Sequence, residues 1–219
     1  MTGASSGIGR ALSKEFCKED NNRVLGIGRN SESLNEIKKT YSDCFDYLVL
    51  DLSRVENIRL IVTEVAVRFD ALDILVNNAG YGLYKGLLEV DINEMINMTL
   101  VNFIVPLALI KELQSFMRRG STVVNIITAS IHVLMTKLPL YGVWVSCWLI
   151  STLGFIVLGA PFIGAHVIGL HPFRVTPIHS SPSSSSGSQL WGNPHILALS
   201  THPLRSLPCT RIVDEFNPQ

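Results

Sequence analysis

The chain has 219 residues, and its 18 Lys and Arg residues balance its 18 Asp and Glu residues. Zero net charge argues against a nucleic-acid-binding protein, because such proteins gain much of their affinity by neutralising phosphates. It also argues against an acidic, disordered chain, and the length is sufficient for one domain with a sizeable core.

The charged residues divide the chain into two unlike parts. Residues 1–137 carry 15 Lys and Arg and 16 Asp and Glu, whereas residues 138–219 carry only three Arg, one Asp and one Glu. Only the first part approaches the charged fraction of about 25% that is usual in soluble domains. We therefore expect one domain over 1–177, followed by a low-complexity, disordered tail over 178–219 that is rich in serine and proline.

The four cysteines, Cys17, Cys44, Cys147 and Cys209, are far apart in the sequence and show neither a CxxC motif nor a Cys/His ligand spacing. The sequence therefore predicts no disulfide framework and no metal site, and it favours a reducing compartment. The polar, glycine-rich first residues lack the apolar region of a signal peptide, so we expect a cytoplasmic protein.

Short apolar strands and amphipathic helices alternate along the first part of the chain. In order, we expect a glycine loop at 3–9, a helix at 10–17, a strand at 23–27, a helix at 31–39, a strand at 47–50, a helix at 55–69, a strand at 72–76, a helix at 92–114 and a strand at 123–127. Strands separated by helices of this length are typical of βαβ units and predict a parallel sheet.

The glycine loop places Gly3, Gly7 and Gly9 at the entrance of the first helix. Glycines let the backbone come close to a pyrophosphate, and a helix N-terminus supplies free N–H groups and the positive end of a dipole. A simple turn with a helix cap would have the same spelling. The position at the start of a βαβ series favours a dinucleotide-binding loop.

Three motifs in order resemble the short-chain dehydrogenase/reductase family: TGASSGIG at 2–9, Asp51 after a strand, and NNAG at 77–80. The resemblance covers residues 2–143 and reappears at 164–176. It implies an NAD(P)-dependent oxidoreductase with an α/β fold, a Rossmann-like doubly wound parallel sheet. Only Met1 precedes the first motif, so the first strand is expected to be nearly absent, and the C-terminal tail is expected to be irregular.

The resemblance also assigns a set of cofactor-binding residues, which are Gly3, Ser5, Ser6, Gly7, Ile8, Gly9, Arg29, Asp51, Leu52, Asn78, Ala79 and Gly80. Arg29 follows the second strand, at the place where NAD enzymes usually carry an acidic residue. An arginine there would attract a 2′-phosphate, so we expect NADP(H) rather than NAD(H). A solvated arginine at a strand end is the alternative interpretation.

By the same resemblance, Tyr141 is the proton-donating tyrosine and Asn102 is the asparagine that supports the proton relay. The serine that hydrogen-bonds the substrate is replaced by Thr128, with Ser130 as the alternative. The family lysine would stand four residues after the tyrosine, but Val145 occupies that position. Valine cannot bind ribose hydroxyls or lower the pKa of a tyrosine, which is about 10 when unperturbed.

Tyr81 and Lys85 have the same spacing as the family's tyrosine and lysine. They directly follow the NNAG motif, so we interpret this spacing as accidental and expect Tyr81 to pack on the substrate side or to have no role.

Residues 141–163 carry no charge, which leaves three interpretations open. The segment is long enough for a transmembrane helix. It also occupies the place of the family helix that carries the lysine and packs against a second subunit. A disturbed reading frame is the third interpretation.

The favoured function is that of an NADP(H)-dependent oxidoreductase that interconverts a small-molecule carbonyl and an alcohol. We expect no nucleic-acid partner, and the sequence is compatible with a homo-oligomer. The alternatives are a catalytically inactive, cofactor-binding relative or degraded gene product, and a variant anchored in a membrane through 141–163.

Overall fold

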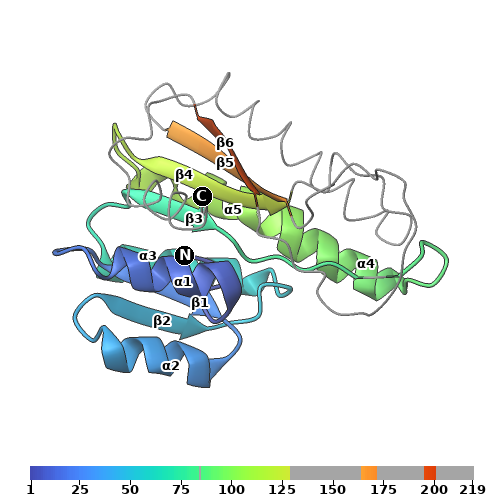
Figure 1. Ribbon diagram of the computed structural model, residues 1–219, viewed down its shortest axis with the longest axis horizontal. Helices are drawn as coiled ribbons and strands as arrows, with labels where there is room; N and C mark the ends of the chain where they lie inside the picture. The colour runs from blue at the N-terminus through green and yellow to red at the C-terminus, as the bar shows by residue number, and fades with distance from the viewer. Residues whose placement is uncertain (84, 129–163, 172–194, 201–219) are drawn as a thin grey trace, which may run out of the picture.

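The computed structural model describes residues 1–83, 85–128, 164–171 and 195–200 (Figure 1). The elements are α1 (Gly7–Phe16), β1 (Val24–Gly28), α2 (Ser31–Thr40), β2 (Phe45–Val49), α3 (Glu56–Arg68), β3 (Ile74–Asn77), α4 (Ile92–Thr99), η1 (Leu100–Ile104), α5 (Val105–Leu113), η2 (Gln114–Phe116), β4 (Thr122–Thr128), β5 (Gly164–His171) and β6 (His195–Ser200). Their alternation confirms the predicted order of strands and helices. Ser130, Tyr141, Val145 and the charge-free segment 141–163 lie outside the described residues.

The strands form two sheets. β1 pairs with β2 in parallel, and β3, β4 and β5 are parallel neighbours. β6 pairs with β5 in the antiparallel direction, from His166 opposite Ser200 to His171 opposite His195. This strand lies within 178–219, where the sequence predicts no regular structure.

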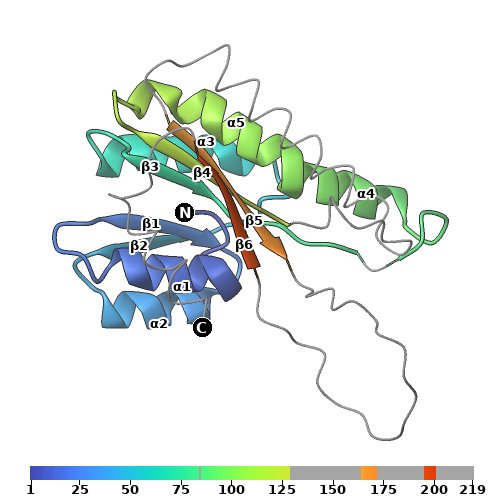
Figure 2. The ribbon, with the colours of Figure 1, turned by 45° about the horizontal axis from the view of Figure 1, so that its top comes forward.

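Helices cover both faces of the strands, as Figure 2 shows with α3 and α5 on one side and α1 and α2 on the other. The period of two along a strand explains this arrangement. Leu75 and Val123 pack in the cluster that includes α3 and α5 residues. Their neighbours Val76 and Val124 pack instead against Leu12 of α1. The predicted doubly wound α/β fold is therefore confirmed.

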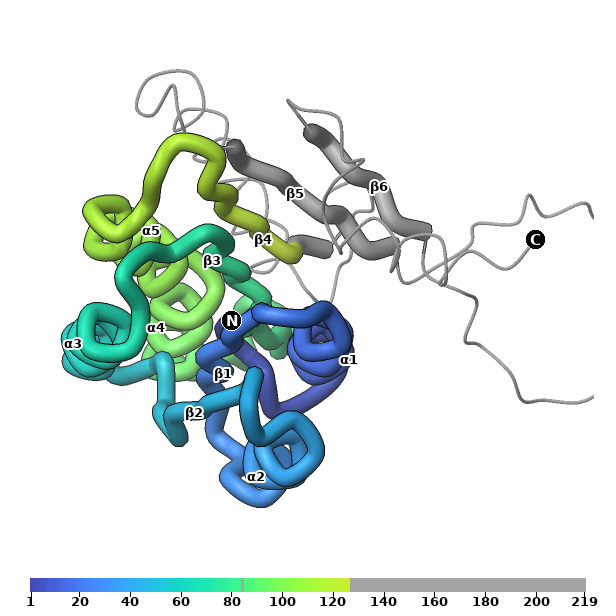
Figure 3. The backbone as a smooth tube through the Cα atoms, turned by 90° about the vertical axis from the view of Figure 1, so that its left-hand side faces the viewer, coloured from blue at the N-terminus to red at the C-terminus, as the bar shows by residue number. Residues whose placement is uncertain are grey.

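Residues 1–4 join the two sheets, and Figure 3 shows the N-terminus between β1 and β3. Thr2 donates its N–H to the carbonyl of Val76 (2.9 Å), while Ala4 donates to the carbonyl of Ile27 (3.0 Å) and Ile27 donates to that of Met1 (2.9 Å). This short extended segment lies where the first strand of the sheet would run.

Beyond Met1, β1 and β3 are separated by a cavity of about 270 Å³. Leu25 and Ile74 line it from the strands, and Val65 and Leu113 line it from the helices. The Met1 amino group donates a hydrogen bond to the carbonyl of Leu25 (3.0 Å). Desolvation lowers the pKa of this amino group to about 5, because burial disfavours the charged form.

The predicted helix at 92–114 consists of separate segments with a π-helical turn, η1, between α4 and α5. Pro106 has no N–H to donate to the carbonyl four residues earlier, so the α pattern is interrupted there. Val105 accordingly donates its N–H to Leu100, five residues back. The whole stretch Ile92–Phe116 is long and apolar enough to cross a membrane. However, Leu109 and Leu113 lie in the core, as in a helix that packs on a sheet.

Cys17 and Cys44 form a disulfide, which the sequence analysis did not predict, since it expected no disulfide framework. The two cysteines are 27 residues apart in the sequence, and their spacing gives no signal. The fold brings the end of α1 and the start of β2 together, so that the two Cα atoms are 5.5 Å apart.

Candidate functional site

The glycine loop adopts backbone conformations that side chains disfavour. Gly3 has a φ of +70° and Gly7 has a φ of +51°, both in the left-handed region. Glycine adopts this region without the steric cost that a Cβ atom imposes. These two glycines therefore allow the chain to turn from the extended segment of residues 1–4 into α1.

The third glycine allows a close approach inside the loop. A Cβ atom on Gly9 would collide with the carbonyl oxygen of Gly3 and with the side-chain amide of Asn78. That amide donates to the carbonyls of Thr2 (3.0 Å) and Gly3 (3.3 Å). The backbone N–H groups of Asn78 and Ala79 both donate to the Thr2 hydroxyl oxygen, at 2.9 and 3.0 Å. The NNAG segment thus holds the glycine loop in place through these hydrogen bonds. Thr2 is the main partner on the loop side, and the sequence analysis did not identify it.

The N-terminus of α1 is open toward ligands. Its N-cap residue, Ser6, makes no side-chain cap hydrogen bond, and the first turn contains no acidic residue. The first N–H groups of a helix have no partner within the helix and carry a partial positive charge. Ser6, Gly7 and Ile8 are exposed, so this helix end offers donors that suit a phosphate.

A cleft of about 120 Å³ lies beside this helix end. It is lined by residues from the glycine loop and from the segments that follow β1, β2 and β3: Gly3, Ser5, Ser6, Ile27, Gly28, Arg29, Leu50, Asp51, Leu52, Ala79, Gly80, Tyr81 and Val101. Eight predicted cofactor residues are among them. Gly7, Ile8 and Gly9 form the start of α1 next to the cleft. Asn78 holds the glycine loop by donating a hydrogen bond to the Gly3 carbonyl.

Arg29 and Asp51 place opposite charges in the cleft wall. Arg29 is exposed and follows Gly28, where a Cβ atom would come within 2.7 Å of the Ser5 hydroxyl. Asp51 accepts a hydrogen bond from the backbone N–H of Ser53 (2.9 Å). This bond lowers the pKa of Asp51, and the positive charge of Arg29 contributes in the same direction, so the carboxyl is ionised at neutral pH.

Tyr81 lines the same cleft. The amide of Asn102 holds it: Asn102 Oδ1 accepts from the Tyr81 N–H (3.0 Å) and Nδ2 donates to the Tyr81 carbonyl (2.7 Å). Burial raises the pKa of the Tyr81 phenol. Lys85 forms an ion pair with Glu94 (2.7 Å).

The predicted catalytic residues are only partly described. Thr128 is the last residue of β4, and Asn77 ends the neighbouring strand β3. Asn102 lies in the π-helical turn and is nearly buried. Carboxyl ends of parallel strands form the edge where ligands bind in open α/β sheets, so Thr128 is at the appropriate edge. Ser130 and Tyr141 lie outside the described residues.

In the described ranges, no group of three or more His, Cys, Asp and Glu side chains is placed to hold a metal ion.

The family model described as short chain dehydrogenase matches residues 1–143 of this chain. The chain belongs to the short-chain dehydrogenase family. Proteins of this family are oxidoreductases that bind NAD(P).

The similarity to known proteins covers different fractions of the chain. An uncharacterized oxidoreductase of Staphylococcus epidermidis is 33% identical over 102 residues, which cover 47% of this chain and 44% of the relative. A short-chain dehydrogenase structure from Streptomyces avermitilis has a TM-score of 0.71 at 26% identity, covering 86% of this chain and 70% of that one. A metagenomic short-chain oxidoreductase solved in complex with NADP has a TM-score of 0.68 at 22% identity, covering 80% of each chain. The chain thus spans less than half the length of the Staphylococcus relative.

Proposed function

We propose that this chain binds NADP(H) in the cleft beside α1 and interconverts a small-molecule carbonyl and an alcohol. The observation that carries the proposal is the uncapped N-terminus of α1 beside a cleft that contains an exposed arginine. The N–H groups of the first helical turn would hold the pyrophosphate. The guanidinium of Arg29 would hold the 2′-phosphate, because it can make charge-assisted, bidentate hydrogen bonds. The metagenomic neighbour that was solved with NADP is consistent with this choice.

The chemistry would combine a hydride from the bound dinucleotide with a proton from the protein. We assign the proton to the Tyr141 hydroxyl, and we assign the hydrogen bond to the substrate oxygen to Thr128, with Ser130 as the alternative. Asn102 would maintain the loop that carries Tyr81, through the two hydrogen bonds described above. The small-molecule substrate, the cytoplasmic location and a homo-oligomeric state belong to the same proposal.

The cofactor preference is tested by exchanging Arg29 for aspartate and measuring the dissociation constants of NADPH and NADH. Loss of a charge-assisted contact of about 1.5–3 kcal/mol should weaken NADPH binding roughly tenfold to hundredfold, with little loss for NADH. Arg59→Ala is a matched control, because Arg59 is an exposed arginine on α3 that does not line the cleft. Equal losses for both nucleotides would contradict the assignment of the 2′-phosphate to Arg29.

A second candidate function is a cofactor-binding relative without activity, and the valine at position 145 favours it. The two candidates are separated by assaying NADPH oxidation with a panel of ketones and aldehydes, for the natural chain and for Val145→Lys. Turnover in the natural chain supports the oxidoreductase. NADPH binding without turnover in the natural chain supports the inactive relative, and turnover that appears only in Val145→Lys would attribute the loss of activity to the valine.

A further inference from the structure

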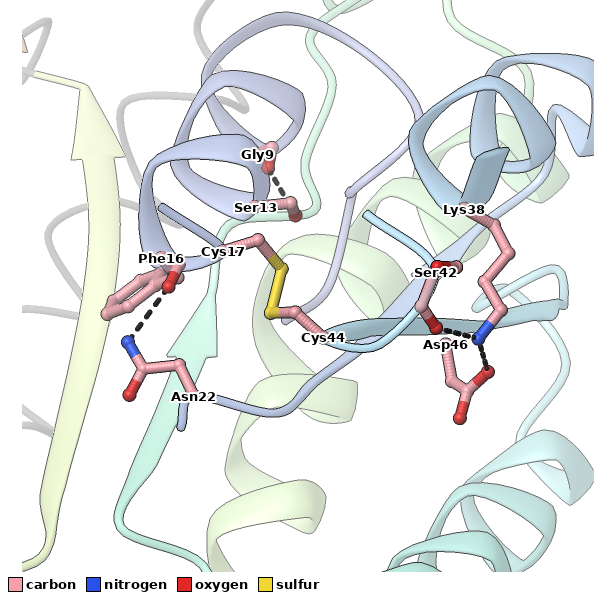
Figure 4. The surroundings of a disulfide bond; sticks show 9 residues. All are labelled: Gly9, Ser13, Phe16, Cys17, Asn22, Lys38, Ser42, Cys44 and Asp46. Carbon is pink, nitrogen blue, oxygen red and sulfur yellow. Dashed lines mark hydrogen bonds and ion pairs between the residues drawn. A yellow bond between two sulfur atoms is a disulfide. The ribbon is translucent and has the colours of Figure 1, made fainter. Parts of the chain in front are cut away.

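The Cys17–Cys44 disulfide connects two elements of the nucleotide-binding half (Figure 4). Cys17 caps the C-terminus of α1, where its N–H donates to the carbonyl of Ser13 (3.3 Å). Cys44 directly precedes β2, and its carbonyl accepts the N–H of Val24 at the start of β1 (2.8 Å). The disulfide therefore attaches the end of the helix to the point where the pairing of β1 and β2 begins.

The disulfide also lies against a small apolar core that includes a residue of the glycine loop. Cys17 packs against a cluster made of Ala4, Leu34, Ile37 and Phe45, all of which are fully buried. Ala4 belongs to the glycine loop, and Phe45 is the residue after Cys44. A methyl group at Gly26 would strike both the Phe45 ring and the Ala4 side chain, which shows how closely they pack. A single layer of packed side chains thus separates the disulfide from the glycine loop, so a movement of the disulfide can be transmitted to the loop.

Without the disulfide, α1 is still held by the buried side chains of Leu12 and Phe16, but the polar contacts of the helix are partly exposed. Asn22 donates to the carbonyl of Phe16 (2.8 Å) near the end of the helix. Arg10 forms an ion pair with the exposed Glu36 on α2 (2.6 Å), and surface pairs of this kind contribute about 0–1 kcal/mol. Opening the disulfide should therefore loosen the helix end without unfolding the domain.

The two cysteines of the disulfide are not fully buried. Cys17 and Cys44 are both half-buried, and exposed Lys18 and Asp43 stand next to them in the sequence. Disulfides that are accessible to solvent are more often labile or regulatory than fully buried ones.

We propose that Cys17 and Cys44 are a reversible redox modification site that controls the affinity of the cleft for NADP(H). This inference depends on the proposed binding of NADP(H). A glutathione thiolate attacks one protein sulfur, and the other sulfur leaves as a thiolate and takes up a proton. A second glutathione thiolate then releases the remaining protein thiol, so that two glutathiones become glutathione disulfide while the protein disulfide becomes two thiols. The oxidised form holds α1 and the glycine loop in place, and the reduced form binds the dinucleotide more weakly.

The test uses the full chain carrying Cys147→Ser and Cys209→Ser, which leaves only the two cysteines of the disulfide. The protein is equilibrated in oxidising and in reducing glutathione buffers, and free thiols are counted after denaturation. No free thiols in the oxidising buffer and two in the reducing buffer are expected. Two free thiols in both buffers would overturn the proposal.

The affinity for NADPH is then measured by calorimetry in both buffers. We expect the reduced form to bind at least threefold more weakly, and we expect this difference to disappear when Cys17→Ser and Cys44→Ser are added. Equal affinity of the two redox forms would overturn the control of binding and leave a purely structural disulfide.

Hydrogen exchange over residues 3–16 distinguishes failure of this inference from failure of the proposed function. If neither form binds NADPH, the proposed cofactor is wrong, and with it the control of NADP(H) affinity. Faster exchange in the reduced form would still support the coupling from the disulfide to the loop, and equal exchange would refute that coupling.

Discussion

Lowering the pH from 8 to 5 is expected to destabilise a chain that starts with an unmodified Met1. The Met1 amino group lies between β1 and β3, bonded to the carbonyl of Leu25, and desolvation lowers its pKa from 8.0 to about 5. In the unfolded chain the amino group regains its ordinary pKa. Between pH 5 and 8 the unfolded state therefore binds more protons than the folded state, and the free energy of unfolding rises with pH.

The size of the effect follows from the difference between the two pKa values. Three pH units at 1.36 kcal/mol each give about 4 kcal/mol, reached in full only if the amino group is the sole group that titrates differently. The penalty is complete below pH 5 and absent above pH 8. The carboxyls of Asp46, Asp51 and Glu94 have lowered pKa values, so their contributions are lost below this range and do not overlap with it.

Urea unfolding at a series of pH values measures the effect, with an N-terminally acetylated chain as the control. Acetylation removes the titrating amino group but changes no other ionisable group. The difference in unfolding free energy between the two chains should change by about 4 kcal/mol between pH 5 and pH 8. A difference that is independent of pH would show that the amino group is solvated in the folded state and would refute the reasoning.

Three further predictions concern the glycine loop, the disulfide and Asn102. Gly9→Ala should abolish the thermal shift by NADPH, because its Cβ atom has no space against the loop backbone; an unchanged shift would show that the loop can rearrange. Cys17→Ser with Cys44→Ser should lower the unfolding free energy by up to about 3.5 kcal/mol in urea without reductant, as expected for a closed loop of this length. Asn102→Ala should cost about 1–3 kcal/mol by leaving the Tyr81 backbone groups without their partner, and thermal unfolding would detect it; no loss would indicate that water replaces the amide.

The sequence predicted the order of elements well, because each short strand and each amphipathic helix carries its own apolar pattern. It also located the cleft, since the glycine loop and NNAG are contiguous motifs. The interruption of the long helix was missed although Pro106 signals it, because the apolar residues continue across the π-helical turn.

Contacts between residues that are distant in the sequence could not be predicted from the sequence alone. Nothing in the spacing of Cys17 and Cys44 indicates that they meet, since their approach results from the packing of α1 against β1 and β2. The position of Tyr81 in the wall of the cleft depends in the same way on its hydrogen bonds to Asn102, which is 21 residues away. Such contacts follow from the assembled fold.

The split between the two sheets has a consequence for how the molecule opens. β1 and β2 are linked to β3 by the backbone hydrogen bonds of residues 1–4 and by a shared apolar cluster, while a cavity replaces further strand pairing. Units that are joined by fewer hydrogen bonds can open at lower free energy than the rest of a domain. The half that contains α1, β1, α2 and β2 should therefore behave as a separate cooperative unit, whose amide protons exchange sooner than those of β3 and β4. A bound dinucleotide would touch both units and would slow that opening.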